Sequence, residues 1–123
     1  MVVAYLVVNA VLYAVFAVAS AIVPERIAAA LGFTLDAQGR VEFLTVYAGL
    51  ELGLAVFYGW AAYADAAAQR SAMLFSLFLY AGLVLFRVTG IVRYGMPGTT
   101  MLAVAGLEML LLLGAIALTL RAN

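Results

Sequence analysis

Three ionisable side chains interrupt long apolar stretches of this sequence: Glu51, Arg87 and Glu108. If those stretches are helices of 1.5 Å rise per residue, Glu51 and Glu108 each lie about 13 Å from the same side of the helices. Arg87 lies about 9 Å from that side, and its long side chain extends further. The spacing therefore predicts one layer that holds two acids and one base. Such a layer can form ion pairs, carry protons or bind a small polar ligand.

Isolated charges are costly inside a membrane, by about 2.5–3.5 kcal/mol each on insertion scales. We therefore expect a Glu51–Arg87–Glu108 cluster that is turned inward and held by charge-assisted hydrogen bonds. Tyr47 lies on the helix face of Glu51 and is the best candidate for an additional donor. With both acids ionised the cluster would carry one negative charge, so one acid holds a proton or another group shares the charge. A structural layer that fixes helix packing and a proton relay both fit this pattern.

The composition indicates that the surrounding elements are membrane helices. Of the 123 residues, 69% are apolar and only 10% are charged, which is too few to cover the surface of a soluble domain. The sequence predicts an all-α integral membrane protein with a single domain over residues 1–123. Four stretches are long enough to cross a hydrocarbon core of about 30 Å. They are residues 1–23, 41–63, 71–92 and 99–120.

The segments between these stretches are short, so neighbouring spans must run in opposite directions. The prediction is an antiparallel bundle of four transmembrane helices. Residues 25–32, after the first span, are expected to form a short helix along the membrane interface, and residues 34–40 a polar turn. Tyr58, Trp60 and Tyr63 predict an aromatic belt at the far end of the second span. The arginines are split too evenly between the two sides to decide the orientation.

The second span also contains Gly49 and Gly53 in a small-xxx-small pattern, which allows another helix to approach closely. The glycines lie about 200° around the helix from Glu51. One face of this span is thus predicted to carry the ionic layer and another to pack against a neighbour. That neighbour lies either within the bundle or in a partner chain.

Two absences narrow the possible functions. The sequence has no Cys, which excludes disulfides, iron–sulfur clusters and thiol chemistry. It also has no His, the commonest transition-metal ligand and general base. We therefore assign no catalytic residues and no metal ligands, and the sequence favours a protein that is not an enzyme. Six basic residues balance six acidic ones, so no charge imbalance points to a nucleic acid.

The pattern resembles a family of small bacterial four-span membrane proteins of unknown function, related to the DoxX-like group. The resemblance rests on Glu42, on the segment from Tyr47 to Gly53, on Arg87, on the turn from Tyr94 to Gly98, and on Glu108. Ala48 stands where the family often has a glycine. Membership would imply a four-helix fold and a location in the bacterial inner (cytoplasmic) membrane. It implies no established activity.

Three classes of function remain. The first is an accessory or scaffold subunit of a larger membrane complex, which the sequence favours. The second is a bundle that binds or transports a small ligand, a lipid, a quinone or protons through the Glu-Arg-Glu layer. The third is a membrane enzyme that uses carboxylate acid–base chemistry. No cofactor is predicted, although a bound lipid, quinone or pigment stays open. The expected partners are the lipid bilayer and either a larger complex or further copies of this chain.

Overall fold

The computed structural model describes residues 1–121, and these are almost entirely helical. Helix covers 88% of residues 1–121, and these residues contain no β-strand. Four helices are long and apolar enough to cross a membrane: Val2–Ile22, Ala37–Tyr63, Ala66–Tyr94 and Thr99–Arg121. The prediction of an all-α chain with four potential spans is therefore confirmed. The chain divides into two compact units, Val3–Ala64 (the N-terminal unit) and Met1–Val2 with the chain from Asp65 onward (the C-terminal unit).

Helix α1 (Val2–Ile22) lies in the N-terminal unit except for its first residue, and the short helix α2 (Pro24–Ala30) follows it. Pro24 begins α2, where its missing N–H is not needed. The helix ends in a Schellman motif: Gly32 has a φ of +86°, and the Phe33 N–H bonds to the Ala28 carbonyl at 2.8 Å. Helix α2 coincides with the short helix that the sequence predicts after the first span.

The second long helix begins earlier than the sequence suggests. Residues 37–40, expected in a polar turn, form the first turn of α3 (Ala37–Phe43). The reason is Asp36, whose side chain caps the helix by accepting a hydrogen bond of 2.7 Å from the Gly39 N–H. A surface ion pair of 3.1 Å between Arg40 and Glu25 joins α3 to α2. Both of its side chains are more than half exposed, so it contributes little to stability.

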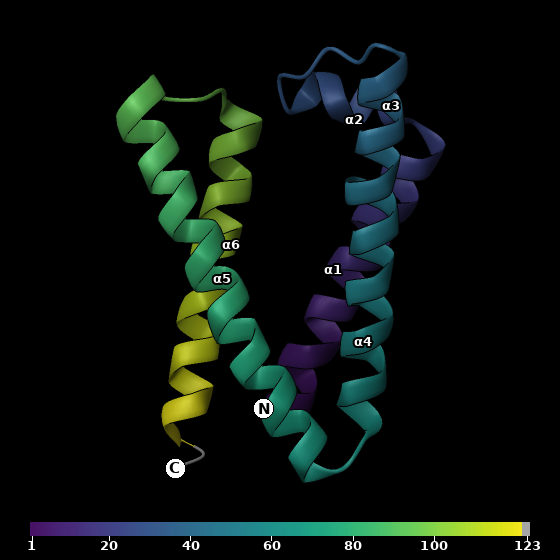
Figure 1. The fold of residues 1–123 in the computed structure, drawn as a ribbon. Coiled ribbons are helices and arrows are strands. Elements are labelled where there is room, and N and C mark those ends of the chain that lie inside the picture. The colour runs from purple at the N-terminus through teal and green to yellow at the C-terminus, as the bar shows by residue number, and fades with distance from the viewer. Residues whose placement is uncertain (122–123) are drawn as a thin grey trace. The chain divides into compact units, whose positions relative to one another are not determined.

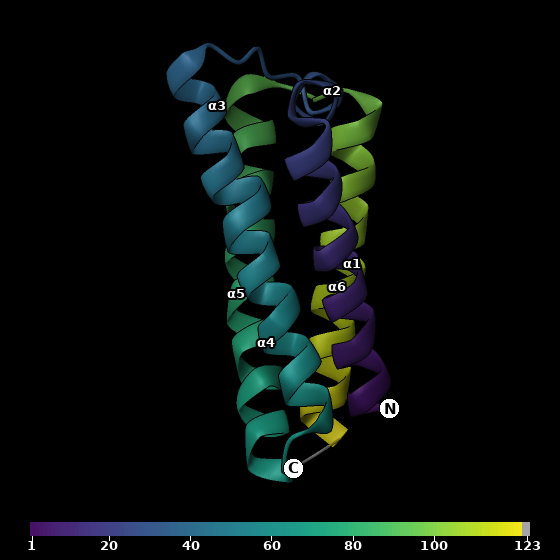
Figure 2. The ribbon, with the colours of Figure 1, turned by 90° about the vertical axis from the view of Figure 1, so that its right-hand side faces the viewer.

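Helix α3 continues without a break into a π-helical segment, η1 (Leu44–Leu50), and then into α4 (Glu51–Tyr63). Figures 1 and 2 show α4 running antiparallel beside α1. The rings of Tyr13 and Tyr58 stack between them with centroids 5.7 Å apart and planes 2° apart. Because Tyr58 is fully buried in this contact, it does not belong to the predicted aromatic belt. Trp60 and Tyr63 are exposed.

The C-terminal unit is a helical hairpin of α5 (Ala66–Tyr94) and α6 (Thr99–Arg121), which lie side by side (Figures 1 and 2). Asp65 caps α5 by accepting a hydrogen bond of 2.8 Å from the Ala68 N–H. The sequence predicts residues 65–70 as a short connection that is still partly helical, and residues 66–70 are helical in the structure. At the other end α5 stops at Gly95, whose φ of +94° suits a residue without a side chain.

Both helices of the hairpin carry buried residues. On α5 the buried residues are Ala72, Met73, Ser76 and Tyr80, and on α6 they are Glu108 and Ala115. Several of these side chains are small, which allows the two backbones to approach closely in a membrane helix pair. The Ser76 hydroxyl donates a hydrogen bond of 2.8 Å to the Ala72 carbonyl of its own helix. This packing holds Arg87 and Glu108 opposite each other.

Candidate functional site

Arg87 and Glu108 form a two-point ion pair across the α5–α6 hairpin. The Arg87 Nε donates to Glu108 Oε2 at 2.6 Å, and Nη2 donates to Oε1 at 2.5 Å. The side chains are only 23% and 11% exposed. A planar guanidinium and a carboxylate match in this geometry, and each ion supplies the counter-charge that the other needs away from water. The pair as a whole is neutral.

The third guanidinium nitrogen of Arg87 is also engaged. Its Nη1 donates to the Met101 sulfur at 2.7 Å. Met101 lies on α6, two turns before Glu108, so Arg87 reaches along the partner helix as well as across to it. From the sequence Met101 is expected only to fill space. A sulfur is a weak acceptor, and the contact could not be inferred from residue type.

Glu51, the third member of the predicted cluster, is the first residue of α4 and belongs to the N-terminal unit. Its side chain is half-buried. Of the predicted cluster, the structure brings Arg87 and Glu108 together within one unit. That Glu51 joins them stays a prediction.

Tyr47, predicted as a donor to Glu51, lies within the π-helical segment η1. Three phenylalanine rings surround its ring: Phe43 at a centroid distance of 4.5 Å, Phe33 at 6.1 Å and Phe16 at 6.3 Å. These distances are typical of stacked and tilted aromatic contacts. Tyr47 therefore anchors the apolar packing of the N-terminal unit. The hydrogen bond from Tyr47 to Glu51 stays a prediction.

The π-helical segment itself was not anticipated. Leu44–Leu50 contains no Pro and only one polar aliphatic residue, Thr45, so nothing in the sequence distinguishes it from an α-helix. A π-helix follows i→i+5 hydrogen bonds and is frequently found at functional sites. Here it ends directly before Glu51. A π-helix would show itself in a wider spacing of the residues that pack inward. Which residues pack inward is known only from the tertiary contacts.

Gly49 and Gly53, predicted to permit close helix packing, are both exposed. A Cβ added to Gly53 would meet no other atom within 4 Å, and one added to Gly49 would meet only the Leu44 carbonyl of its own helix, at 3.7 Å. Within the N-terminal unit, the close approach occurs instead at Gly59, where an added Cβ would lie 3.9 Å from the Ala10 side chain. A packing role for Gly49 and Gly53 therefore stays a prediction.

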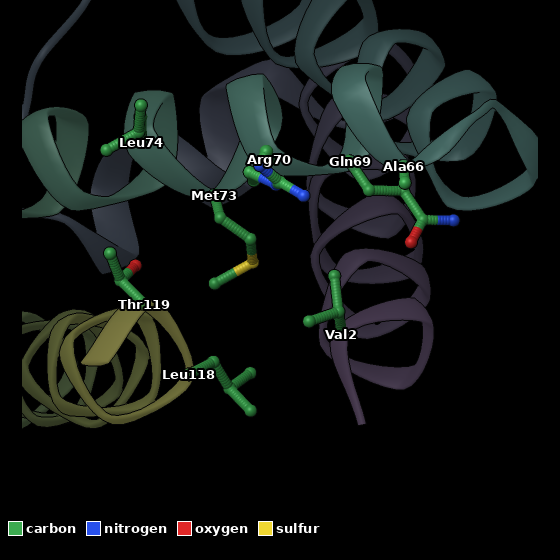
Figure 3. Close-up of a pocket in the computed structure, with 8 residues that line it drawn as sticks. All are labelled: Val2, Ala66, Gln69, Arg70, Met73, Leu74, Leu118 and Thr119. Atoms are coloured by element: carbon green, nitrogen blue, oxygen red, sulfur yellow. The ribbon is translucent and has the colours of Figure 1, made fainter. Parts of the chain in front are cut away.

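A second candidate site is a cavity of about 220 Å³ at the open end of the hairpin. Figure 3 shows Met73 of α5 extending toward α6, where Leu118 and Thr119 lie, and Arg70 beside Gln69 at the edge of this space. The lining is mainly apolar, and its polar side chains are those of Gln69, Arg70 and Thr119. In the sequence, Arg70 bears only on the membrane orientation of the chain, and nothing marks Thr119 as part of a site. Within residues 1–121 there is no group of three or more acidic residues that could hold a metal ion.

Comparisons with known proteins identify no relative of this chain. No protein-family model, no curated protein sequence and no solved structure matches the chain.

Proposed function

We propose that this protein is a non-enzymatic membrane protein of four antiparallel spans that serves as an accessory or scaffold subunit of a larger membrane complex. The observation that carries the proposal is the state of Arg87. Two of its nitrogens bond to Glu108 and the third to Met101. A guanidinium with all three nitrogens engaged inside the protein acts as a fixed link between helices. It has little left to offer a substrate.

The outer surface supports the same proposal. Between 11% and 17% of the residues in the most apolar stretch of each long helix are buried inside the protein. Large side chains such as Phe78 and Phe86 on α5 are 72% and 73% exposed. Lipid covers such a surface well, and so does a neighbouring membrane protein. The exposed Gly49 and Gly53 would allow a partner helix to approach closely at α4.

The resemblance to the DoxX-like four-span group supports a location in the bacterial inner membrane. We propose membership of that group on the residues from Tyr47 to Gly53 together with Arg87 and Glu108. No activity is established for the DoxX-like group, so membership would not assign a reaction to this chain. The proposal of a scaffold role therefore rests on the ion pair and the exposed apolar faces.

The experiment that tests the scaffold role is gentle detergent extraction from the native membrane, followed by mass analysis of the intact particles. We expect this chain to be recovered in a stoichiometric complex with a larger membrane protein. Recovery of the chain only as a monomer or as copies of itself would overturn the proposal.

An alternative role in proton or ligand binding is favoured by one observation. Glu51 is a half-buried carboxyl that directly follows a π-helical segment, the kind of distortion that is frequent at functional sites. Reconstitution into vesicles with an internal pH-sensitive dye tests it. The alternative requires proton flux above that of empty vesicles, and loss of this flux in Glu51→Gln. Equal flux in protein-containing and empty vesicles would rule out proton transport.

A further inference from the structure

We propose that the cavity at the open end of the α5–α6 hairpin binds the phosphate group of an anionic membrane phospholipid. Arg70 would supply the positive charge and the Thr119 hydroxyl a second hydrogen-bond donor. The cavity belongs to the C-terminal unit and is separate from the Arg87–Glu108 pair. The proposal therefore concerns a binding site beyond the scaffold role.

Within residues 1–121, no carboxylate lies within 4.0 Å of the Arg70 guanidinium, in contrast to Arg40 and Arg87, which pair with Glu25 and Glu108. Arg70 is exposed at the rim of the cavity, so its guanidinium is accessible from outside. A guanidinium offers a planar set of N–H donors that matches the oxygens of a phosphate.

Thr119 provides an independent observation. Its Oγ1 is buried and has no hydrogen-bond partner. A buried polar atom without a partner is uncommon in folded proteins, because leaving it unsatisfied is unfavourable. Thr119 lines the same cavity as Arg70 (Figure 3). Because Oγ1 has almost no accessible surface, the Thr119 side chain would have to turn toward the cavity when the ligand binds, and a ligand oxygen would then accept its proton.

The position of the cavity along the helices fits a lipid headgroup. Helix α5 has 29 residues and is about 44 Å long, whereas the hydrocarbon core is about 30 Å thick, so its ends reach the headgroup region. Arg70 lies about 6 Å from the start of α5, and Thr119 lies in the last turn of α6. Basic pockets between membrane helices at this depth are typical sites for anionic headgroups.

The remaining walls explain why the ligand is an amphiphile and not a free ion. Met73, Leu74 and Leu118 make the lining mainly apolar. A volume of about 220 Å³ is less than the roughly 300–1,000 Å³ of pockets that enclose whole drug-sized ligands. The cavity would therefore hold the phosphate and the adjoining part of the lipid, while the acyl chains lie along the exposed side of Leu74.

The test uses the full chain, purified in detergent and titrated with phosphatidylglycerol while native mass spectrometry counts the bound lipids. We expect one lipid to bind more tightly than the rest, and Arg70→Gln to weaken it about tenfold, because a charge-assisted hydrogen bond is lost. Thr119→Val, which preserves the shape of the side chain, should weaken binding several-fold. The matched control is Arg121→Gln, an exposed arginine at the same end of the hairpin, which should leave the affinity unchanged.

Three outcomes would overturn the proposal. Equal losses in Arg70→Gln and Arg121→Gln would indicate general attraction of anionic lipid to positive charge. Equal affinity for phosphatidylcholine, whose ammonium group offsets the phosphate charge, would indicate binding driven by the apolar walls alone. Displacement of phosphatidylglycerol by millimolar inorganic phosphate would assign the cavity to the free ion. A circular dichroism spectrum that matches the wild type is the condition for comparing each variant.

Discussion

Arg87 and Glu108 are 21 residues apart in the chain, yet they meet through two hydrogen bonds of 2.6 and 2.5 Å between neighbouring helices. The pair is mostly shielded from solvent. An ion pair in such surroundings stabilises a structure only as long as both partners are present, because either charge alone is left uncompensated.

The first prediction concerns the removal of one partner. Glu108→Leu should lower the stability of the hairpin by about 3–5 kcal/mol, because Arg87 is then a buried charge without an anion. The double variant Arg87→Met with Glu108→Leu should recover most of the loss, since no charge remains. Thermal unfolding in detergent, followed by circular dichroism, measures both. A double variant that is as unstable as the single one would show that the pair does more than balance charge.

The second prediction tests whether Glu51 belongs to the same layer. If it faces Arg87 as the sequence predicts, Glu51→Leu should lower the unfolding temperature, and Glu51→Gln should have a smaller effect because it keeps a polar acceptor. Exposed Glu42 is the matched control, and Glu42→Gln should change nothing. An unfolding temperature in Glu51→Leu equal to the wild type would remove Glu51 from the cluster and leave the Arg87–Glu108 pair intact.

The third prediction concerns the tyrosine stack of the N-terminal unit. Tyr58 is fully buried against Tyr13, so Tyr58→Ala should cost about 3–5 kcal/mol through the loss of buried area and the cavity that it leaves. Trp60→Ala, two residues further on the same helix and 60% exposed, should cost far less in detergent. Denaturant unfolding of the two variants provides the comparison. Similar losses would mean that Trp60 is covered in the folded protein.

The fourth prediction follows from the exposed glycines of α4. Gly53→Leu should leave folding in detergent unchanged, because an added Cβ meets no other atom within 4 Å. If Gly49 and Gly53 receive a partner helix, the same variant should lower the recovery of the complex from membranes. Gly106→Leu on α6 is the matched control, since Gly106 is also open but is not part of a small-xxx-small pattern. Normal recovery of the complex with Gly53→Leu would exclude this face as the contact.

Part of the candidate site could be predicted from the sequence. Arg87 and Glu108 stand alone in apolar surroundings, and the expense of burying a charge requires each to find a partner. Their similar depth in adjacent helices then makes the pairing predictable. The contact with Met101 could not be predicted, because many side chains can fill the space beside a guanidinium. The cavity beside Arg70 could not be predicted, because it depends on how far α5 and α6 are shifted along each other. That shift follows from the Arg87–Glu108 pair, and the pair is seen only in the folded hairpin.

The sequence by itself determined that the chain forms four long apolar helices, because hydropathy and length are properties of each segment alone. It also indicated where most helices end, since Pro24 and Gly95 act on the local backbone. Tertiary structure alone decided the π-helical segment Leu44–Leu50 and the burial of Tyr58. Both depend on which side chains meet across helices, and an apolar stretch permits many such pairings of similar energy. The buried Thr119 hydroxyl without a hydrogen-bond partner is likewise a result of how α5 and α6 pack, so it could not be predicted from the sequence.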